Sequence, residues 1–198
     1  MAVLRMSTYI SIRRQISTRV AKILLPVWLL TLPISSGMGL AQSVSIEYQI
    51  KAAFLLNFTR YVEWPNRSGD LNICVLGPDV FGNVLYDVAA GKIVNGRKIV
   101  VRKSVSQIEA SACQIVYLSL PPGKPIRDAL KGLGQSSALT VGEDADFLRM
   151  GGMIAFAPAE GKVRFYINAA GAGHAGIKIS SRLLVLGRNI RDEGERLR

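Results

Sequence analysis

Two short and almost uninterrupted apolar segments constrain the fold of this chain most. They are residues 71–77 (L-N-I-C-V-L-G) and residues 113–120 (C-Q-I-V-Y-L-S-L). Runs of this kind are typical of strands that are covered on both faces and lie in the middle of a parallel sheet. A helical pattern follows each run, at residues 80–90 and 126–133, and a β-branched strand is expected at residues 98–102. The order predicts an α/β fold: a single-domain α/β sandwich with a mostly parallel sheet, in which the first and third strands are neighbours.

An amphipathic helix is expected just before the first strand, in residues 51–65 (K-A-A-F-L-L-N-F-T-R-Y-V-E-W-P). Spacings of three and four predict a buried face that contains Ile50, Phe54, Phe58 and Tyr61. The same wheel puts polar residues off that face, namely Lys51, Thr59, Arg60 and Glu63. Ser45 is expected to cap the helix. Pro65 disfavours helical geometry at the preceding residue, so the helix should stop at Trp64.

The last third of the sequence departs from the strand-helix alternation. Residues 153–158 and 163–168 flank a turn at 159–162 and predict an antiparallel hairpin at one edge of the sheet. A final helix is expected over residues 177–190, where one face is apolar and carries Ile179, Leu183, Leu186 and Ile190.

Residues 1–41 have the pattern of a secretory signal peptide. A basic region without acids precedes an apolar run at residues 23–34, and small residues at 39 and 41 precede Gln42. The alternative is a membrane anchor, although a spanning helix needs roughly twenty apolar residues. We expect cleavage after residue 41, one domain at residues 42–190, and a charged tail at 191–198 that frays.

The formal net charge of +11 overstates the basic character of the exported part. Residues 1–41 carry five of the 25 Lys and Arg residues and none of the 14 acids, which leaves +6 for the remainder. Nucleic-acid binding would need a concentrated basic stripe with interleaved aromatic residues, whereas these bases are dispersed. We expect no nucleic-acid partner.

Cys74 and Cys113 are the two cysteines of the chain, and both lie in the part expected to be exported. In an oxidising compartment such a pair favours a disulfide, worth roughly 4 kcal/mol for a loop of about 40 residues on the chain-entropy model. Neighbouring first and third strands would bring the two residues close enough to join. Two buried free thiols remain the alternative, because cysteine is also a common core residue.

The sequence contains no complete catalytic or cofactor-binding motif. Residues 171–176 (G-A-G-H-A-G) match G-x-G-x-x-G, but no second strand of a βαβ unit follows, so a tight turn is expected instead of a dinucleotide site. His174 is the single histidine, which leaves a triad or a multi-histidine metal site incomplete. Glu143, Asp144 and Asp146 suit a helix start. We expect a binding protein that has no catalytic residues, cofactor or metal and is not an enzyme.

Several stretches, taken in order, resemble one family. They are residues 58–65 (F-T-R-Y-V-E-W-P), 73–77 (I-C-V-L-G), 94–99 (V-N-G-R-K-I), 113–119 (C-Q-I-V-Y-L-S), 151–154 (G-G-M-I), 163–168 (V-R-F-Y-I-N) and 180–184 (S-S-R-L-L). Together they resemble the YfiR family of periplasmic proteins over nearly the whole of the expected domain.

This resemblance implies a periplasmic repressor that binds the periplasmic sensor region of an inner-membrane diguanylate cyclase, and so lowers cyclic di-GMP and biofilm formation. It implies release under reducing conditions or by capture on an outer-membrane lipoprotein, and it extends to a homodimer and a small aromatic ligand. Cys74 and Cys113 match a disulfide of the family. A second disulfide, which some members carry nearer the C-terminus, has no counterpart in this sequence.

The expected contact surface for the cyclase combines the exposed side of the opening helix with the start of the last helix. Its residues are Arg60, Glu63, Trp64, His174, Lys178 and Arg182. Charged and aromatic side chains are common anchors at interfaces. The alternative from another class is a small-molecule-binding periplasmic sensor without a cyclase partner, whose ligand would lie at the carboxyl ends of the strands near Gly77 or Gly171.

Overall fold

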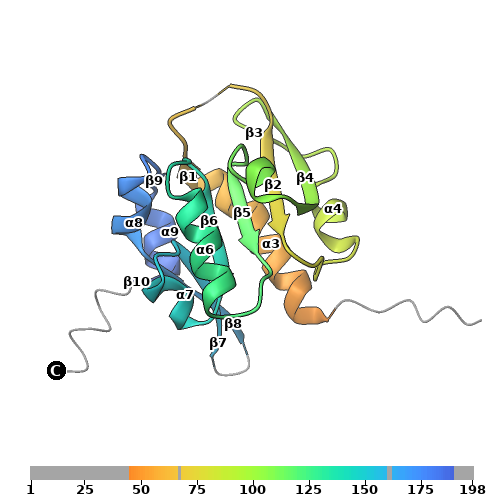
Figure 1. The fold of residues 1–198 in the computed structure, drawn as a ribbon. Coiled ribbons are helices and arrows are strands. Elements are labelled where there is room, and N and C mark those ends of the chain that lie inside the picture. Colours follow the sequence, from red (N-terminus) through yellow and green to blue (C-terminus); the bar gives the residue numbers. More distant parts are fainter. Residues whose placement is uncertain (1–44, 67, 160–161, 190–198) are drawn as a thin grey trace, which may run out of the picture. The chain divides into compact units, whose positions relative to one another are not determined.

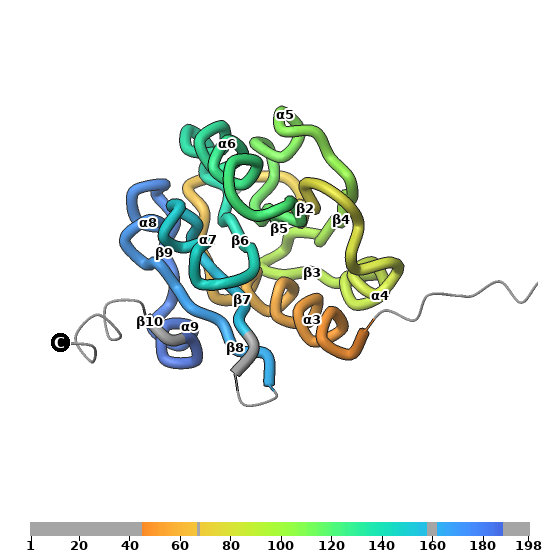
Figure 2. The backbone as a smooth tube through the Cα atoms, turned by 60° about the horizontal axis from the view of Figure 1, so that its bottom comes forward, coloured from red at the N-terminus to blue at the C-terminus, as the bar shows by residue number. Residues whose placement is uncertain are grey.

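Parallel pairing dominates the central sheet. The computed structural model describes residues 45–66, 68–159 and 162–189. In these residues an eight-stranded sheet has the order β10-β8-β7-β6-β5-β2-β4-β3, and β1 and β9 form a separate two-stranded ribbon. Helices cover both faces of the sheet (Figure 1, Figure 2). The expected α/β fold class is confirmed.

The first predicted strand lies in the middle of the sheet. β2 (Leu71–Leu76) pairs in parallel with β4 (Arg97–Val105) on one side and with β5 (Ile115–Leu118) on the other. The first and third predicted strands are therefore neighbours, as expected. The sheet continues in parallel through β6 (Leu139–Glu143) and β7 (Ile154–Ala159), and β3 (Ile93–Val94) forms a short hairpin with β4.

Two apolar clusters separate the layers. On one face, α3 (Ile46–Tyr61), α4 (Val84–Ala89) and α9 (Ser181–Leu186) pack against inward residues such as Ile73 and Val75. On the other face, α5 (Gln107–Ala110), α6 (Lys124–Leu133) and α7 (Ala145–Arg149) pack against their neighbours Cys74 and Leu76. Because both faces of β2 are covered, its sequence is almost continuously apolar.

The opening helix is present, but it ends at Tyr61 instead of Trp64, and its buried face differs from the prediction. The side chain of Ser45 accepts a hydrogen bond from the Tyr48 amide and caps α3. Phe58 is fully buried as predicted, whereas Ile50 is 40% exposed and Lys51 is only 2% exposed. The helical wheel therefore placed the buried face of α3 on the wrong side of Lys51 and Ile50. The physical reason is that Lys51 has charged partners inside the domain, which the apolar spacing cannot reveal.

The last third of the chain is more broken than predicted. β8 (Lys162–Ile167) forms the expected antiparallel hairpin with β7, but β10 (Arg188–Asn189) pairs in parallel beyond it and becomes the edge of the sheet. The predicted helix over residues 177–190 is wrong in extent. β9 (Lys178–Ile179) comes first, Ser180 then caps the six-residue α9, and Gly187 ends it.

Gly187 follows the last helix in an extended conformation and packs closely against β8. A Cβ atom at this position would lie 2.6 Å from the ring of Phe165, so the backbone approaches β8 more closely than any other residue would allow. The glycine-rich segment at residues 171–176 is also not simply a turn, because α8 (Ala169–His174) occupies most of it. The turn follows at Gly176, which has a φ of +73°.

The predicted signal peptide at residues 1–41 and the predicted tail at 191–198 lie outside the described residues. Within the described part of the chain, no helix is both long enough and apolar enough to span a bilayer.

Candidate interaction surface and cavity

The two groups of predicted contact residues meet at the β1–β9 ribbon. β1 (Val62–Glu63) pairs antiparallel with β9, so that Glu63 lies directly opposite Lys178 and Val62 opposite Ile179. The Ser180 amide continues the ladder by donating a hydrogen bond to the carbonyl oxygen of Tyr61 at 2.9 Å. Segments from the two ends of the domain are thus fixed side by side (Figure 1).

The other charged residues of the prediction lie on the elements that lead into this ribbon. Arg60 is in the last turn of α3, His174 is the last residue of α8, and Arg182 is in the first turn of α9. All three side chains are exposed, as are Glu63 and Lys178. We call this set of residues the ribbon surface: Arg60, Glu63, His174, Lys178 and Arg182. It carries three cations and one anion with His174 neutral, a net charge of +2.

Trp64 does not belong to the exposed surface, and that part of the prediction is wrong. Its side chain is 5% exposed, and its indole Nε1 donates a hydrogen bond to the Gln114 carbonyl oxygen at 2.8 Å. The helix ends at Tyr61, so residues 62–64 alternate as an extended segment, with Val62 and Trp64 inward and Glu63 outward. A helical wheel cannot describe these three positions.

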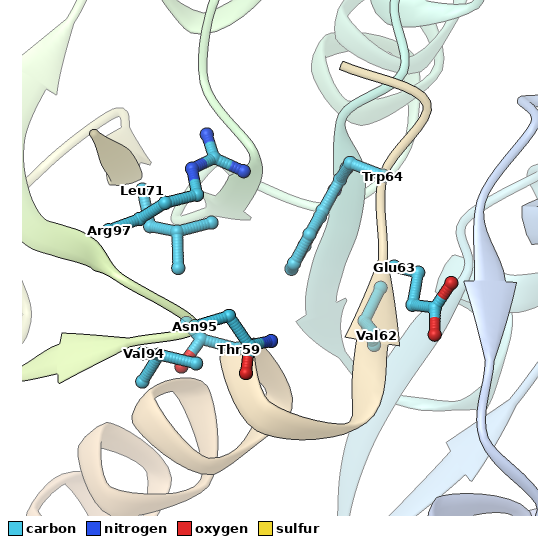
Figure 3. Close-up of a pocket in the computed structure, with 8 residues that line it drawn as sticks. All are labelled: Thr59, Val62, Glu63, Trp64, Leu71, Val94, Asn95 and Arg97. Atoms are coloured by element: carbon cyan, nitrogen blue, oxygen red, sulfur yellow. The ribbon is translucent and has the colours of Figure 1, made fainter. Parts of the chain in front are cut away.

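A cavity of about 180 Å³ lies on the inner side of β1. Its walls come from the end of α3, from β1, from the start of β2 and from the β3–β4 turn (Figure 3). The lining residues are Thr59, Val62, Glu63, Trp64, Leu71, Val94, Asn95 and Arg97. In Figure 3 the flat face of the Trp64 ring is turned towards Leu71 and Arg97, and the Glu63 carboxylate points away from the space between them.

The polar groups in these walls are largely engaged in the protein itself. The Arg97 guanidinium donates to the carbonyl oxygens of Gly69, Ser68 and Asp70 at 2.7, 3.0 and 2.9 Å, and so fixes the loop that follows Trp64. Thr59 Oγ1 donates to the Leu56 carbonyl oxygen at 2.6 Å. The lining also contains Asn95, the indole ring of Trp64 and the aliphatic side chains of Leu71 and Val94, so the cavity offers both polar and apolar surface.

Gly77 and Gly171, near which a ligand was the alternative expectation, are both closely packed on their Cβ side. A Cβ atom at Gly77 would lie 2.5 Å from the Ser119 carbonyl oxygen, and one at Gly171 would lie 2.9 Å from the Asn168 amide nitrogen. Both glycines therefore allow a close approach of other protein atoms that a side chain would prevent. The cavity at Trp64 lies instead at the amino end of β2, which the rule about carboxyl ends of parallel strands does not predict.

An ionic cluster around the buried Lys51 side chain fixes the first half of α3 to the sheet, and the sequence did not reveal it. Lys51 Nζ lies 2.6 Å from Glu47 Oε1 and 2.8 Å from Glu143 Oε1, and it lies over the ring of Tyr48 at 4.5 Å from the centroid. Glu143 was expected at the start of a helix, but it ends strand β6, and Asp144 caps α7 instead. The spacing of four between Glu47 and Lys51 was visible in the sequence, whereas the contact with Glu143 was not.

Hydrogen bonding and burial shift the pKa values of this cluster. Burial alone would raise the pKa of Glu143 and lower that of Lys51. The Lys51 ammonium and the Tyr117 hydroxyl, which donates to Glu143 Oε1, outweigh burial and hold the pKa of Glu143 below its usual value. The carboxylates of Glu143 and Glu47 likewise hold the pKa of Lys51 above its usual value. Burial, with Glu143 beside it, raises the pKa of Tyr117, so that this phenol stays neutral. These shifts favour a charged Lys51 and a charged Glu143 near neutral pH.

The Cys74–Cys113 disulfide is present, as predicted. It joins β2 to the residue two positions before β5 across a Cα–Cα distance of 6.1 Å, and the two residues are 0% and 4% exposed. Gln114, next to Cys113, accepts the Trp64 hydrogen bond through its carbonyl oxygen and one from the Asn72 amide through its side chain. In the residues that the structure describes, no group of three or more His, Cys, Asp or Glu side chains is placed to hold a metal ion.

A family model described as YfiR/HmsC-like matches residues 48–188, which covers most of the chain. The protein therefore belongs to the YfiR/HmsC-like family, a class of periplasmic regulators of diguanylate cyclase signalling that are regulatory rather than catalytic. The resemblance expected from the sequence is confirmed.

A solved structure supports the α/β fold. A conserved domain protein from Vibrio cholerae O1 biovar eltor has a TM-score of 0.50 and 16% identity, and the match covers 72% of this chain and 59% of the other. The chain thus spans little more than half the length of that protein, and the likeness concerns the α/β fold alone. An ABC domain in complex with L-Trp from Streptococcus pneumoniae reaches a TM-score of 0.44 at 11% identity, covering 72% of this chain and 60% of that one, and is too distant to carry an argument.

Proposed function

We propose that the protein is a periplasmic repressor, which binds the periplasmic sensor region of an inner-membrane diguanylate cyclase and so lowers cyclic di-GMP and biofilm formation. Repression of this kind needs no chemistry. The repressor has only to bind one conformation of the cyclase more tightly than the other, and the difference in affinity sets how far the equilibrium shifts.

The observation that carries this proposal is the ribbon surface. Glu63 and Lys178 are opposite each other in the β1–β9 ladder, and Arg60, His174 and Arg182 flank them on exposed positions. Charged residues held on paired backbone are pre-organised, which reduces the entropy lost on binding. Family membership supplies the kind of partner.

A periplasmic location is part of the proposal. The export pattern of residues 1–41 supports it, and so does the disulfide, because such bonds persist in oxidising compartments. On this account residues 1–41 are removed, residues 42–190 form the working domain, and release involves an outer-membrane lipoprotein. Homodimer formation and binding of a small aromatic ligand belong to the same proposal.

The test is a binding measurement between the purified domain and the purified periplasmic region of the diguanylate cyclase of the same organism, under oxidising and reducing conditions. Deletion of the repressor should raise cellular cyclic di-GMP, and its re-expression should restore the low level. Calorimetry with aromatic amino acids forms a second arm. Ligand binding without any affinity for the cyclase region would favour the small-molecule sensor instead.

A further inference from the structure

Four side chains of the β3–β4 hairpin lie together on one face of the sheet. Lys98 is directly opposite Ile93 in the antiparallel pairing, and Val100 and Arg102 share its side of β4, because alternate side chains of a strand point to the same face. Arg102 lies opposite Cys74 of β2, so this is the face that α5, α6 and α7 cover in the rest of the sheet. We call Ile93, Lys98, Val100 and Arg102 the hairpin face.

The helix layer on this side does not cover the hairpin face. α5 is in contact with β2 and α6, and in Figure 1 β4 lies at the right of the sheet, away from α6. Lys98 and Arg102 are exposed, and Ile93 is 69% exposed. Val100 is half-buried and belongs to neither apolar cluster. Helices normally cover both faces of a mostly parallel sheet, so the hairpin face offers room for one more helix.

The hairpin lies in the middle of a basic stretch of the chain. Residues 88–108 contain five bases and no acid. Two of these bases have partners inside the domain. The Arg97 guanidinium donates to loop carbonyl oxygens, and Lys103 Nζ lies 2.9 Å from Asp79 Oδ2.

The two bases of the hairpin face are free to meet a partner's acids. Lys98 and Arg102 form no salt bridge within the part of the chain that the structure describes. Glu109 is within electrostatic reach of Arg102, but its carboxylate is bound to Ser106 in the capping box of α5. Four strand residues separate the two bases by about 13 Å, which corresponds to about eight or nine residues of α-helix.

Charge and exposure together favour one kind of occupant. A second copy of the same face would bring Lys98 and Arg102 against their own counterparts, and like charges in contact oppose association. An acidic amphipathic helix would instead place carboxylates at the two bases and apolar side chains over Ile93 and Val100. Bases on an outer strand also prevent edge-to-edge pairing of sheets. That role needs only the charges, so the two apolar residues distinguish it from docking.

We propose that an acidic amphipathic helix of a partner protein docks on the hairpin face and extends the helix layer of the domain. Its carboxylates pair with Lys98 and Arg102, and its apolar side chains cover Ile93 and Val100. This contact is separate from the ribbon surface and goes beyond the proposed repression.

The test uses a synthetic helical peptide as the probe. Two Glu residues about eight positions apart flank Leu residues on one face of the peptide, and a scrambled peptide of the same composition is the comparison. Each peptide is titrated into the isotope-labelled domain, and amide chemical shifts report the place and strength of binding. The amphipathic peptide should shift the amides of residues 92–104 and bind at least about fivefold more tightly than the scrambled one.

Charge reversal tests the ionic part of the contact. Lys98→Glu with Arg102→Glu should weaken binding of the amphipathic peptide at least about tenfold, and added salt should weaken binding to the wild type. Lys124→Glu with Arg127→Glu is the matched control, because it makes the same change in net charge on exposed positions of α6. The control should stay within about twofold of the wild type.

A second variant tests the apolar part. Ile93→Ser with Val100→Thr keeps both charges and should weaken binding at least about threefold. Thermal unfolding establishes that each variant is folded, and the charge and apolar variants test the proposal independently.

The remaining outcomes contradict the proposal. Absence of probe binding by the wild-type domain, equal binding of both peptides, or wild-type affinity in the folded charge variant would overturn it. A loss in the charge variant without any loss in the apolar variant would leave the bases with edge protection alone. Adsorption to phosphatidylglycerol vesicles that the charge variant loses, without peptide binding, would assign the hairpin face to lipid headgroups and overturn the protein partner.

Discussion

Lys51 Nζ lies 2.8 Å from Glu143 Oε1, and this pair joins the first helix of the domain to the end of strand β6. The Lys51 side chain is 3% exposed and that of Glu143 is 40% exposed, so the pair is buried at one end and reaches solvent at the other. Because α3 also carries Arg60 and leads into β1, its placement on the sheet positions the ribbon surface.

Removal of the Lys51 charge should destabilise the domain. Lys51→Met leaves Glu143 partly buried without its cation, and breaking a buried pair costs about 3–5 kcal/mol, reduced here to about 2–3 kcal/mol because Glu143 keeps contact with water. Lys124→Met is the matched control, since Lys124 pairs with Asp128 on an exposed face and should change stability by less than about 0.5 kcal/mol. Urea unfolding measures both. Equal losses in the two variants would contradict the structural role of Lys51.

The same pair should make stability depend on pH at the acidic end. The pKa of Glu143 is lower in the folded state than in the unfolded chain, so its contribution is complete above about pH 4.5 and is lost as the pH falls through the folded value. Glu143→Gln should therefore lose less stability than the wild type as the pH falls below about 4.5. Thermal unfolding across that range measures the difference, and parallel curves would exclude a linked Glu143.

The pKa of Lys51 is raised in the folded state, so the stability of the domain should fall with increasing pH at the basic end. Its stabilising contribution is complete below the unfolded value of about 10.5 and is lost as the pH rises further. Wild-type stability should thus fall more steeply above about pH 10.5 than that of Lys51→Met.

The disulfide should stabilise the domain and resist reduction while the domain is folded. The chain-entropy model gives about 4 kcal/mol for a loop of this length, so Cys74→Ala with Cys113→Ala should lower the unfolding free energy by about that amount. Dithiothreitol should reduce the bond slowly in buffer and quickly in urea, because both residues are buried. Fast reduction in buffer would indicate an accessible redox switch.

The glycine pair at residues 151–152 has a packing role at its second position. A Cβ atom at Gly152 would overlap the ring of Phe147, which is fully buried, so Gly152→Ala should cost about 1–3 kcal/mol. Gly173→Ala is the control, because nothing lies within 4 Å of its Cβ position in α8, and it should be neutral or slightly stabilising. Adding Phe147→Leu to Gly152→Ala should recover part of the loss in unfolding free energy.

The central sheet could be predicted because its strands are buried on both faces. The segments that form β2 and β5 are almost continuously apolar, so no polar-apolar alternation has to be assigned to a face. Their neighbouring positions in the sheet follow from the strand-helix order. The disulfide followed from the same geometry, since Cys74 and Cys113 belong to those two segments. Local caps such as Ser45 and Asp144 act over only two or three residues, so their residue types are visible in the sequence beside the helix.

Features that depend on distant partners could not be predicted. Lys51 can be buried because it forms an ion pair with Glu143, and the pattern of apolar residues in α3 contains no information about Glu143. Trp64 can be buried because its indole N–H donates a hydrogen bond to the Gln114 carbonyl oxygen, which is 50 residues away in the sequence. The break between β9 and α9 follows from pairing with β1, which residues 177–190 alone do not encode.

Only part of the candidate surface could be predicted, because its assembly also depends on residues that are distant in the sequence. Exposed charged residues were recognised at Arg60, Glu63, Lys178 and Arg182 by their positions next to packed elements. Their meeting at one ribbon required the β1–β9 pairing, and the cavity beneath it required Leu71 and Arg97 from two further strands.

The most direct test of repression through the ribbon surface is the affinity of Arg60→Glu with Arg182→Glu for the purified periplasmic region of the cyclase. Lys124→Glu with Arg127→Glu is the matched control, because it makes the same change in net charge on α6, at the opposite face of the sheet. The account predicts a loss of at least about tenfold for the ribbon variant and less than about threefold for the control. Wild-type affinity and full repression of cyclic di-GMP in the ribbon variant would contradict it.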